Sequence, residues 1–362
     1  MKRLHYWGFT LILLVLISCT KKSTSKDADY IPVPFTRTEE FKALELDRKA
    51  RRTFGALPID AENPKNPTTQ DKITLGKLLY FDKRLSKDNT QSCNTCHNIA
   101  TYGVDNQSFS MGNDGKLGGR NSPTTFNAAL HFSQFWDGRE PDVEQQAGGP
   151  ILNPVEMAMP NEAEVVSRLS KIDEYIELFN TVFPEDKTPI TYNNIKKAIG
   201  AYERKLITPS KFDLYMSGDD TALNTYEKQG MDTFMSVGCI TCHAGALLGG
   251  TMYQKFGLTV NYWEHTKSKK IDNGRFDLTK NEADRYVFKV PSLRNIEKTG
   301  PYFHDGSVND LKKAIGIMAE TQLNKKLSAK QINEIHIFLQ SLTGQLPDEF
   351  VEETTNTITA IN

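Results

Sequence analysis

The stretch Ser92–Ala100, "SCNTCHNIA", places two cysteines three positions apart with a histidine directly after the second. Cys93, Cys96 and His97 in this order fit three kinds of site: a redox-active pair of thiols, part of a zinc site, or the attachment point of a covalently bound haem. These sites differ in what the rest of the chain must supply. The other cysteines therefore decide between them.

The same motif returns later in the chain as "CITCH". Cys239, Cys242 and His243 repeat the spacing, and Cys19 is the one cysteine outside the two copies. C-x-x-C-H is the signature of c-type haem attachment, because one helical turn offers both thiols to the two vinyl groups while the histidine reaches the iron from the same face. The repeat predicts two covalent haems, with His97 and His243 as iron ligands.

Other uses of these cysteines explain the pattern less well. A zinc site built from all four is the main alternative, but zinc does not need a histidine in the same place twice. A thioredoxin-type redox pair expects alternating strands and helices around the motif, and neither copy has them. Disulfides would close two tight loops that do little to stabilise a fold.

The duplication extends beyond the cysteines. "PTTFNAALHFSQFWDG" begins at Pro123 and "PSLRNIEKTGPYFHDG" begins at Pro291. In both segments an Asn follows four residues after the proline, and Asp-Gly follows ten residues after that Asn. Spacing preserved over this length indicates two copies of one haem-binding unit.

The N-terminus has the features of an export signal. Lys2 and Arg3 precede an apolar run, residues 9–17, that is too short to span a membrane permanently. The following "LISC" resembles the cleavage box of bacterial lipoproteins, in which Cys19 becomes the lipid-carrying first residue. The alternative is an ordinary signal with an incidental cysteine. Residues 20–36 are polar and proline-punctuated, as a tether is.

Composition favours a globular protein of two domains. The chain has 362 residues, of which 38% are hydrophobic and 25% are charged. Its formal net charge of -1 provides no basic surface for nucleic acid. We therefore expect no nucleic-acid partner.

The remaining sequence predicts helices joined by loops. Residues 161–179 open with a capping pair, Asn161 and Glu164, and carry apolar residues on one face. Residues 193–206 and 328–344 show the same periodicity, the latter stopping at a glycine. Because no run of alternating strand residues appears, the fold class is expected to be mainly α.

The order of motifs resembles a known family. "LGKLLYFDKRLS", "SCNTCH", "GGRNSPTTFN", "QFWDGR", "EQQAGGPILNPVEM", "GCITCHAG", "NEADRYVFKVPSLRNIEKTGPYFHDGS" and "LTGQLPD" follow one another as in the bacterial di-haem cytochrome c peroxidases, from about Leu57 to Pro347. The resemblance implies two cytochrome c-like haem domains with long loops. We expect a signal peptide at 1–18, a lipidated N-terminus and tether at 19–40, a peroxidatic haem domain at 41–207, an electron-transfer haem domain at 208–347 and a tail at 348–362.

The resemblance also implies an activity. Such an enzyme reduces hydrogen peroxide to water in the periplasm, with electrons from a small cytochrome c or copper protein. Electrons would enter at the haem on His243 and pass to the haem on His97, where peroxide reacts. The family further implies a homodimer, with membrane contact through the lipid anchor only.

Family motifs assign roles to single residues. Met318 in "AIGIMAETQLN" matches the second axial ligand of the C-terminal haem, and a methionine ligand raises a haem's potential. Glu156 in "NPVEM" matches the acid/base that moves a proton between the peroxide oxygens, and Gln146 in "EQQAGGP" matches its neighbouring amide. Trp136 in "QFWDGR" matches the electron relay between the haems. Asn121, Thr299 and Pro301 match a calcium site built from carbonyl and amide oxygens.

One position departs from the family pattern. Better-known members carry a histidine in the loop after the first haem that caps the peroxidatic iron in the oxidised state. Here the matching residue is Asn113, and no histidine lies between His97 and His131. Because asparagine ligates haem iron poorly, the expectation is that the first haem is open in the oxidised protein. The alternative is that Met111 in the same loop, or another side chain, takes the place of the histidine. His131, His265, His304 and His336 are expected to be structural or exposed.

Two other functions remain open on sequence grounds. One is a non-enzymatic electron-transfer cytochrome with two haems, which Glu156 and Gln146 disfavour. The other is a relative that oxidises the side chains of another protein, as the maturation enzyme of methylamine dehydrogenase does. That relative is expected to have tyrosine where this chain has Met318.

Overall fold

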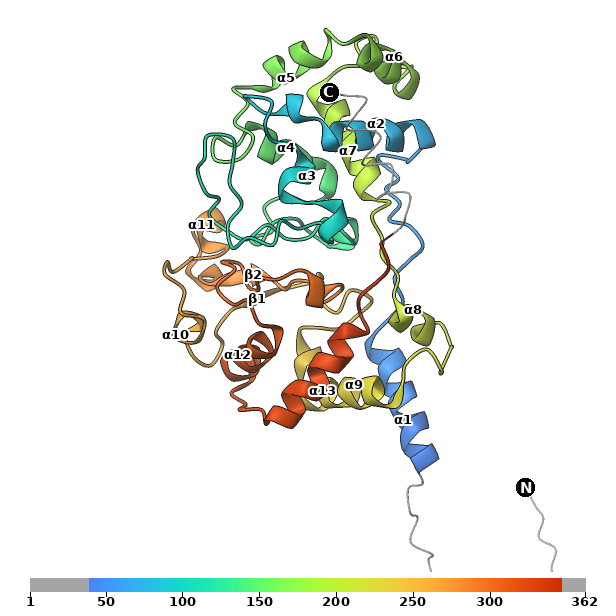
Figure 1. Cartoon of the computed structure of the whole chain (residues 1–362), viewed down its shortest axis with the longest axis vertical. Coiled ribbons are helices and arrows are strands. Elements are labelled where there is room, and N and C mark those ends of the chain that lie inside the picture. The colour runs from blue at the N-terminus through green and yellow to red at the C-terminus, as the bar shows by residue number, and fades with distance from the viewer. Residues whose placement is uncertain (1–38, 347–362) are drawn as a thin grey trace, which may run out of the picture. The chain divides into compact units, whose positions relative to one another are not determined.

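The computed structural model describes residues 39–346, so the predicted signal peptide, Cys19, most of the tether and the tail at 348–362 lie outside the described residues. Residues 39–43 group with the N-terminal part of the chain, and the described residues from 44 onward form one compact unit (Figure 1). Over residues 39–346, no helix is long and apolar enough to cross a membrane.

The fold is mainly α, which confirms the prediction. Within residues 39–346 the strands form one short antiparallel pair, β1 and β2, in which Gln254 pairs with Phe288. Long loops join the helices. The elements are α1 Glu39–Thr53, α2 Gln70–Phe81, α3 Cys93–Cys96, α4 Val143–Leu152, α5 Glu162–Leu169, α6 Asp173–Val182, α7 Tyr192–Glu203, α8 Lys211–Met216, α9 Thr225–Val237, β1 Tyr253–Lys255, α10 Tyr262–Thr266, α11 Phe276–Thr279, β2 Val287–Lys289, α12 Leu311–Leu323 and α13 Ala329–Gln340.

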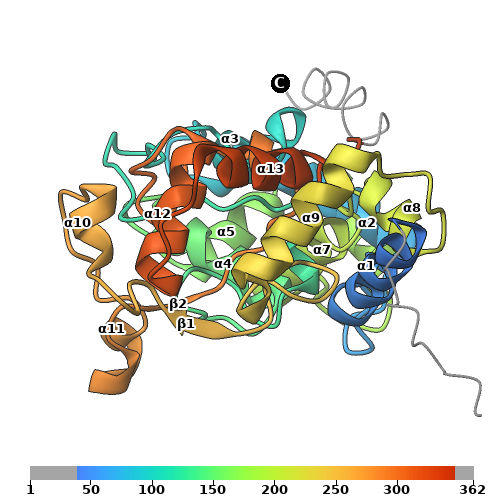
Figure 2. The same ribbon diagram turned by 90° about the horizontal axis from the view of Figure 1, so that it is seen from below.

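Two large hydrophobic clusters form the cores. The first takes its buried residues from segment 75–206, chiefly from α2, α4, α5, α6 and α7. The second takes them from segment 212–342, chiefly from α8, α9, α12 and α13, together with Ala50 of α1 and Phe54 directly after that helix. Figure 1 shows α2, α4 and α7 in one group and α9, α12 and α13 in another, and Figure 2 shows the second group from below.

A glycine permits close helix packing in each core. A Cβ on Gly76 of α2 would lie 1.9 Å from the carbonyl oxygen of Ala198 on α7. A Cβ on Gly230 of α9 would lie 2.1 Å from the carbonyl oxygen of Glu334 on α13. Real Cβ atoms do not come so close, so both helix pairs depend on the missing side chain.

One predicted helix is two helices. Asn161 caps α5 as expected, and its side chain accepts a hydrogen bond from the Glu164 amide. The chain then turns at residues 170–172, and α6 begins at Asp173. Ile176, predicted to face the core, is therefore 37% exposed. The other two expected helices correspond to α7 and α13, and α13 ends at Gln340 rather than at Gly344.

The sequence duplication is also a structural one. Asn127 and Asn295 both adopt a left-handed backbone, with φ of 61° and 59°, and both start a short 3-10 helix. The Nδ2 groups of these two residues donate to the same hydroxyl, that of Thr208, at 2.9 and 2.8 Å. The two copies therefore meet at Thr208.

Candidate functional site

The first C-x-x-C-H motif occupies α3, a single helical turn. Ser92 and Thr95 form a capping box at its start, and the His97 amide donates to the Cys93 carbonyl at 2.9 Å. The turn therefore holds both thiols and the imidazole on one short element, as attachment to the two vinyl groups requires. His97 Nδ1 lies 2.9 Å from the Pro123 carbonyl.

The second motif follows directly on α9. Gly238, with φ of 106°, ends that helix and turns the chain into a 3-10 helix over Cys239–Thr241. His243 Nδ1 lies 2.9 Å from the Leu248 carbonyl. In both motifs Nδ1 donates its proton to a backbone carbonyl, which leaves the Nε2 lone pair for a metal. Burial lowers the pKa of both imidazoles and so favours the neutral form that binds iron.

A mainly apolar cavity adjoins the second motif. Cys239, Cys242 and His243 line it, and so does Met318 from α12. Two thiols, an imidazole with its Nε2 available and a thioether, set in apolar walls, are the groups that a c-type haem uses. The residues thus fit the predicted cofactor. The assignment of Met318 as the second ligand stays a prediction.

The four cysteines of the motifs form no disulfide in the described part of the chain. Cys93, Cys96, Cys239 and Cys242 are all free thiols. Between residues 39 and 346, no three His, Cys, Asp or Glu side chains gather as metal ligands.

Glu156 lies near the first motif. It acts electrostatically on the Cys96 thiol, whose pKa is raised to about 11, chiefly by burial and further by Asp105 and Glu156. Glu156 Oε1 accepts a hydrogen bond from Asn153 Nδ2 at 2.7 Å. Burial raises the pKa of Glu156, although Arg139 and Asn153 oppose this shift. A carboxyl with a raised pKa is suited to proton transfer near neutral pH.

Gln146 lies on α4, the helix that leads toward Glu156. Its side chain is half-buried, and within residues 39–346 no hydrogen bond joins it to Glu156. Arg139, which opposes the pKa shift of Glu156, has its guanidinium 3.3 Å from the centroid of the Phe135 ring. The structure thus brings Arg139 close enough to act on Glu156 through its charge, and the role of Gln146 stays a prediction.

Trp136 and the predicted calcium residues line the same cavity as the second motif. Trp136 Nε1 donates to the Asn121 carbonyl at 2.8 Å, and Asn121 Nδ2 donates to the Gln107 carbonyl at 2.8 Å. Thr299 and Pro301 belong to the same lining. The structure therefore brings Trp136 and all three predicted calcium ligands together, far apart as they are in sequence.

Asn113 is held by hydrogen bonds to two other segments of the chain. The side-chain Oδ1 of Asn113 accepts from the Asp88 backbone amide at 3.1 Å and from the Thr90 hydroxyl at 3.2 Å. The backbone N–H of Asn113 donates to the Glu156 carbonyl at 2.7 Å. Met111, two positions earlier, is 59% exposed. The side chain of Asn113 is thus bound to segment 86–90.

Sequence reasoning missed three polar residues of the cavity. His131 and His304, expected to be structural or exposed, both line it, and each has a buried Nε2 without a hydrogen-bond partner in the described chain. Lys289 joins them. The signal that could have found these histidines is their place in the two duplicated segments, 123–138 and 291–306.

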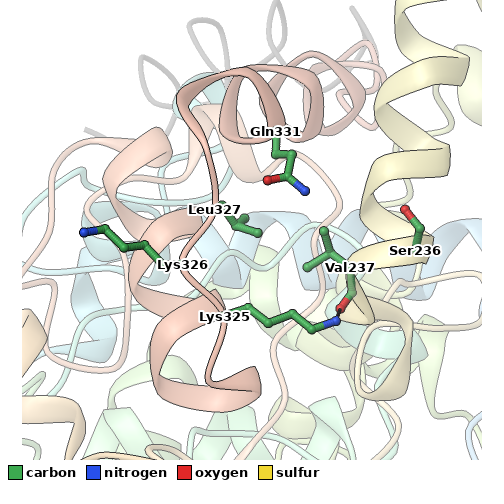
Figure 3. Close-up of a pocket in the computed structure, with 6 residues that line it drawn as sticks. All are labelled: Ser236, Val237, Lys325, Lys326, Leu327 and Gln331. Atoms are coloured by element: carbon green, nitrogen blue, oxygen red, sulfur yellow. Dashed lines mark hydrogen bonds between the residues drawn. The ribbon is translucent and has the colours of Figure 1, made fainter.

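A second pocket lies at the surface near Cys239, whose thiol is within reach of the charge of Lys325. It is lined by the end of α9 and by the loop between α12 and α13 (Figure 3), with Ser236, Val237, Lys325, Lys326, Leu327 and Gln331. Lys325 Nζ donates to the Val237 carbonyl at 2.6 Å, while Lys326 points away from the other labelled side chains. Both lysines are exposed.

Comparisons with known proteins agree with this geometry. The profile of the di-haem cytochrome c peroxidase family matches residues 70–221. Cytochrome c551 peroxidase of Pseudomonas aeruginosa is 46% identical over 84% of this chain and 88% of that protein, and its namesake in Nitrosomonas europaea is 45% identical over 80% and 84%. The solved structure of a MauG-like protein associated with microbial copper homeostasis superposes with a TM-score of 0.73 at 28% identity, covering 81% of this chain and 96% of that one.

Proposed function

The chain belongs to the di-haem cytochrome c peroxidase family, and from that membership we propose that it reduces hydrogen peroxide to water at the haem of His97, using electrons that enter at the haem of His243. Peroxidase activity, two haems and the need for a redox donor follow from the family. The direction of electron flow and the roles of single residues are our proposal. The observation that carries it is a half-buried carboxyl, Glu156, electrostatically coupled to Cys96 of the first motif.

Haem supplies an iron that binds peroxide and exchanges electrons with it. Cys93, Cys96 and His97 would hold the first haem, and Cys239, Cys242, His243 and Met318 the second. Glu156 would take the proton from the inner peroxide oxygen and return it to the outer one, which becomes the leaving water. Gln146 would hydrogen-bond the departing oxygen. Each peroxide consumes two electrons and two protons.

Electron transfer between the haems is assigned to Trp136. Its ring lines the cavity of the second motif, and its indole N–H is held by the Asn121 carbonyl. The donor, a small cytochrome c or copper protein, would approach beside Cys239, where the two exposed lysines of Figure 3 lie. Met318 suits this site for electron entry, because a methionine ligand raises the potential.

Several further assignments belong to the proposal. Asn121, Thr299 and Pro301 would bind one calcium ion, supported by their place in the lining of one cavity. The separate cores support a peroxidatic domain at 41–207 and an electron-transfer domain at 208–347, although α1 contributes to the second core. Export to the periplasm, lipidation at Cys19 and a homodimer rest on the sequence and the family.

The MauG-type alternative is weaker for this chain. The peroxidases named above share 45% and 46% identity with it, whereas a methylamine utilization protein is 30% identical. Met318, not tyrosine, occupies the position that would distinguish the two functions.

The test is steady-state turnover of the exported holoprotein. Reduced small cytochrome c or reduced copper protein is mixed with catalytic amounts of enzyme, and oxidation of the donor is followed with and without hydrogen peroxide. We expect peroxide-dependent oxidation of two donor molecules per peroxide. Rapid electron exchange with the donor but no dependence on peroxide would indicate an electron-transfer cytochrome instead.

A further inference from the structure

The cavity beside the second motif has walls of two kinds. Helices α9, α12 and α13 contribute apolar side chains, among them Phe234, Ile315 and Leu339. The loop before α4 and the strand β2 contribute polar ones, including His131 and Lys289. Lys289 is only 6% exposed, and burial lowers its pKa to about 7. A lysine in such a wall needs a partner, because an unpaired buried charge is costly.

Lys289 and His131 form a pair although they lie 158 positions apart in sequence. Lys289 Nζ is 3.0 Å from His131 Nδ1 and 2.8 Å from the Ser133 carbonyl. A charged ammonium can only donate, so His131 Nδ1 accepts and its proton lies on Nε2. One of the three Lys289 donors is then left without an acceptor.

His131 Nε2 is also without an acceptor. This atom is buried and has no hydrogen-bond partner among the described residues. A buried donor left unpaired costs about 1–3 kcal/mol. No carboxylate within residues 39–346 forms an ion pair with Lys289, and Asp137 acts on it only through its charge. Among the described residues, Lys289 therefore brings a positive charge to the cavity lining with one donor still unpaired.

A haem supplies the missing acceptor. Its porphyrin ring suits the apolar walls, and its two propionate groups are carboxylates that must leave those walls for polar partners. We infer that Lys289 Nζ, held in place by His131 Nδ1, binds a propionate carboxylate of the haem held by Cys239 and Cys242. This inference rests on the proposed second haem site and names residues within it that no family motif above assigned.

The pair has a consequence for electron entry. A positive charge paired with the propionate offsets the negative charge near the iron and so favours the reduced state. Removing Lys289 leaves a buried carboxylate that stabilises the oxidised iron. The midpoint potential of the His243 haem should then fall.

The experiment is a spectroelectrochemical titration of the holoprotein at one pH, with both haems counted by mass spectrometry beforehand. Lys289→Gln should shift the reduction equilibrium of the higher-potential haem by about tenfold or more, which is a fall of 59 mV for a one-electron couple, and leave the other haem unchanged. Lys289→Arg should keep the parental potential. Lys255→Gln, the same charge change at an exposed position of β1, should also leave it unchanged.

Different outcomes separate this inference from the proposed function. If the unmodified protein contains no second haem, the proposed haem site itself is wrong. If both haems are present and each has the same potential in the parent and in Lys289→Gln, the propionate contact alone is wrong. An equal fall of the potential in Lys255→Gln leads to the same conclusion. If Lys289→Gln fails to fold, His131→Phe decides: a lowered potential supports the contact, and an unchanged one contradicts it.

Discussion

At the scale of single residues, the two histidines proposed to bind iron are oriented by the same arrangement. A backbone carbonyl receives the Nδ1 proton of each, from Pro123 for His97 and from Leu248 for His243. The tautomer and the ring orientation are therefore set by the protein before a metal arrives. Glu156 differs from the two histidines because burial raises the pKa of its carboxyl.

Glu156→Gln tests the acid/base role. Glutamine keeps the shape of the side chain but cannot exchange a proton at neutral pH. Peroxide turnover should fall by about two to four orders of magnitude, the range for losing a positioned acid/base, while both haem spectra stay unchanged. Glu162→Gln, an exposed carboxyl on α5, is the control and should retain full turnover. Equal rates in the two variants would remove Glu156 from the mechanism.

Glu203, the last residue of α7, predicts a pH dependence of stability. Burial raises its pKa to about 8, and Glu144 adds to the shift. Between its ordinary pKa and this value, the folded protein binds more protons than the unfolded chain, so stability falls as pH rises from about 4.5 to about 8. Glu203→Gln should flatten this fall in thermal melts of the holoprotein, whereas the exposed Glu174→Gln should not. Parallel pH profiles for all three proteins would refute the assignment.

At the scale of secondary-structure elements, the α2–α7 contact depends on Gly76. Helix propensity alone favours alanine there by about 0.5–1 kcal/mol. The 1.9 Å approach to the Ala198 carbonyl predicts the opposite sign: Gly76→Ala should lower the free energy of unfolding by about 1–3 kcal/mol, as overpacking does. Gly119→Ala, with nothing within 4 Å of the added Cβ, is the control. A stabilised Gly76→Ala in chemical denaturation would show that α2 and α7 are not so closely packed.

The loop over residues 108–120 carries the second element-scale prediction. The Asn113 side chain is bound to segment 86–90 and Met111 is exposed, and asparagine is a poor ligand of haem iron, so we expect neither residue to cap the first haem. Fully oxidised protein should therefore bind cyanide at the His97 haem without prior reduction, seen as an immediate shift of the haem absorption. A low-spin first haem that ignores cyanide until an electron is added would mean that another side chain gates it.

At the scale of the whole molecule, covalent and local features were predictable and long-range contacts were not. The haem motifs, the helical class and the duplication depend on residues close in sequence, and α7 and α13 follow from caps and periodicity. The break between α5 and α6 was missed because the apolar spacing continues across residues 170–172. Lys289 and His131 come into contact only through tertiary packing, and nothing in the sequence near either residue predicts that contact.

The duplication gives the molecule two similar haem units with different surroundings. Glu156 lies near the first motif, and Met318 lines the cavity of the second. The central proposal is therefore that the first haem reacts with peroxide while the second haem receives electrons from the donor. It requires that one chain store two electrons and deliver both to one peroxide.

A single-turnover titration measures this directly. Holoprotein reduced at both haems is mixed anaerobically with one equivalent of hydrogen peroxide, and the oxidation of each haem is followed by stopped-flow absorption. The proposal predicts that both haems become oxidised in one event, with one peroxide consumed per chain. Oxidation of one haem only, or no reaction until a second equivalent is added, would contradict it.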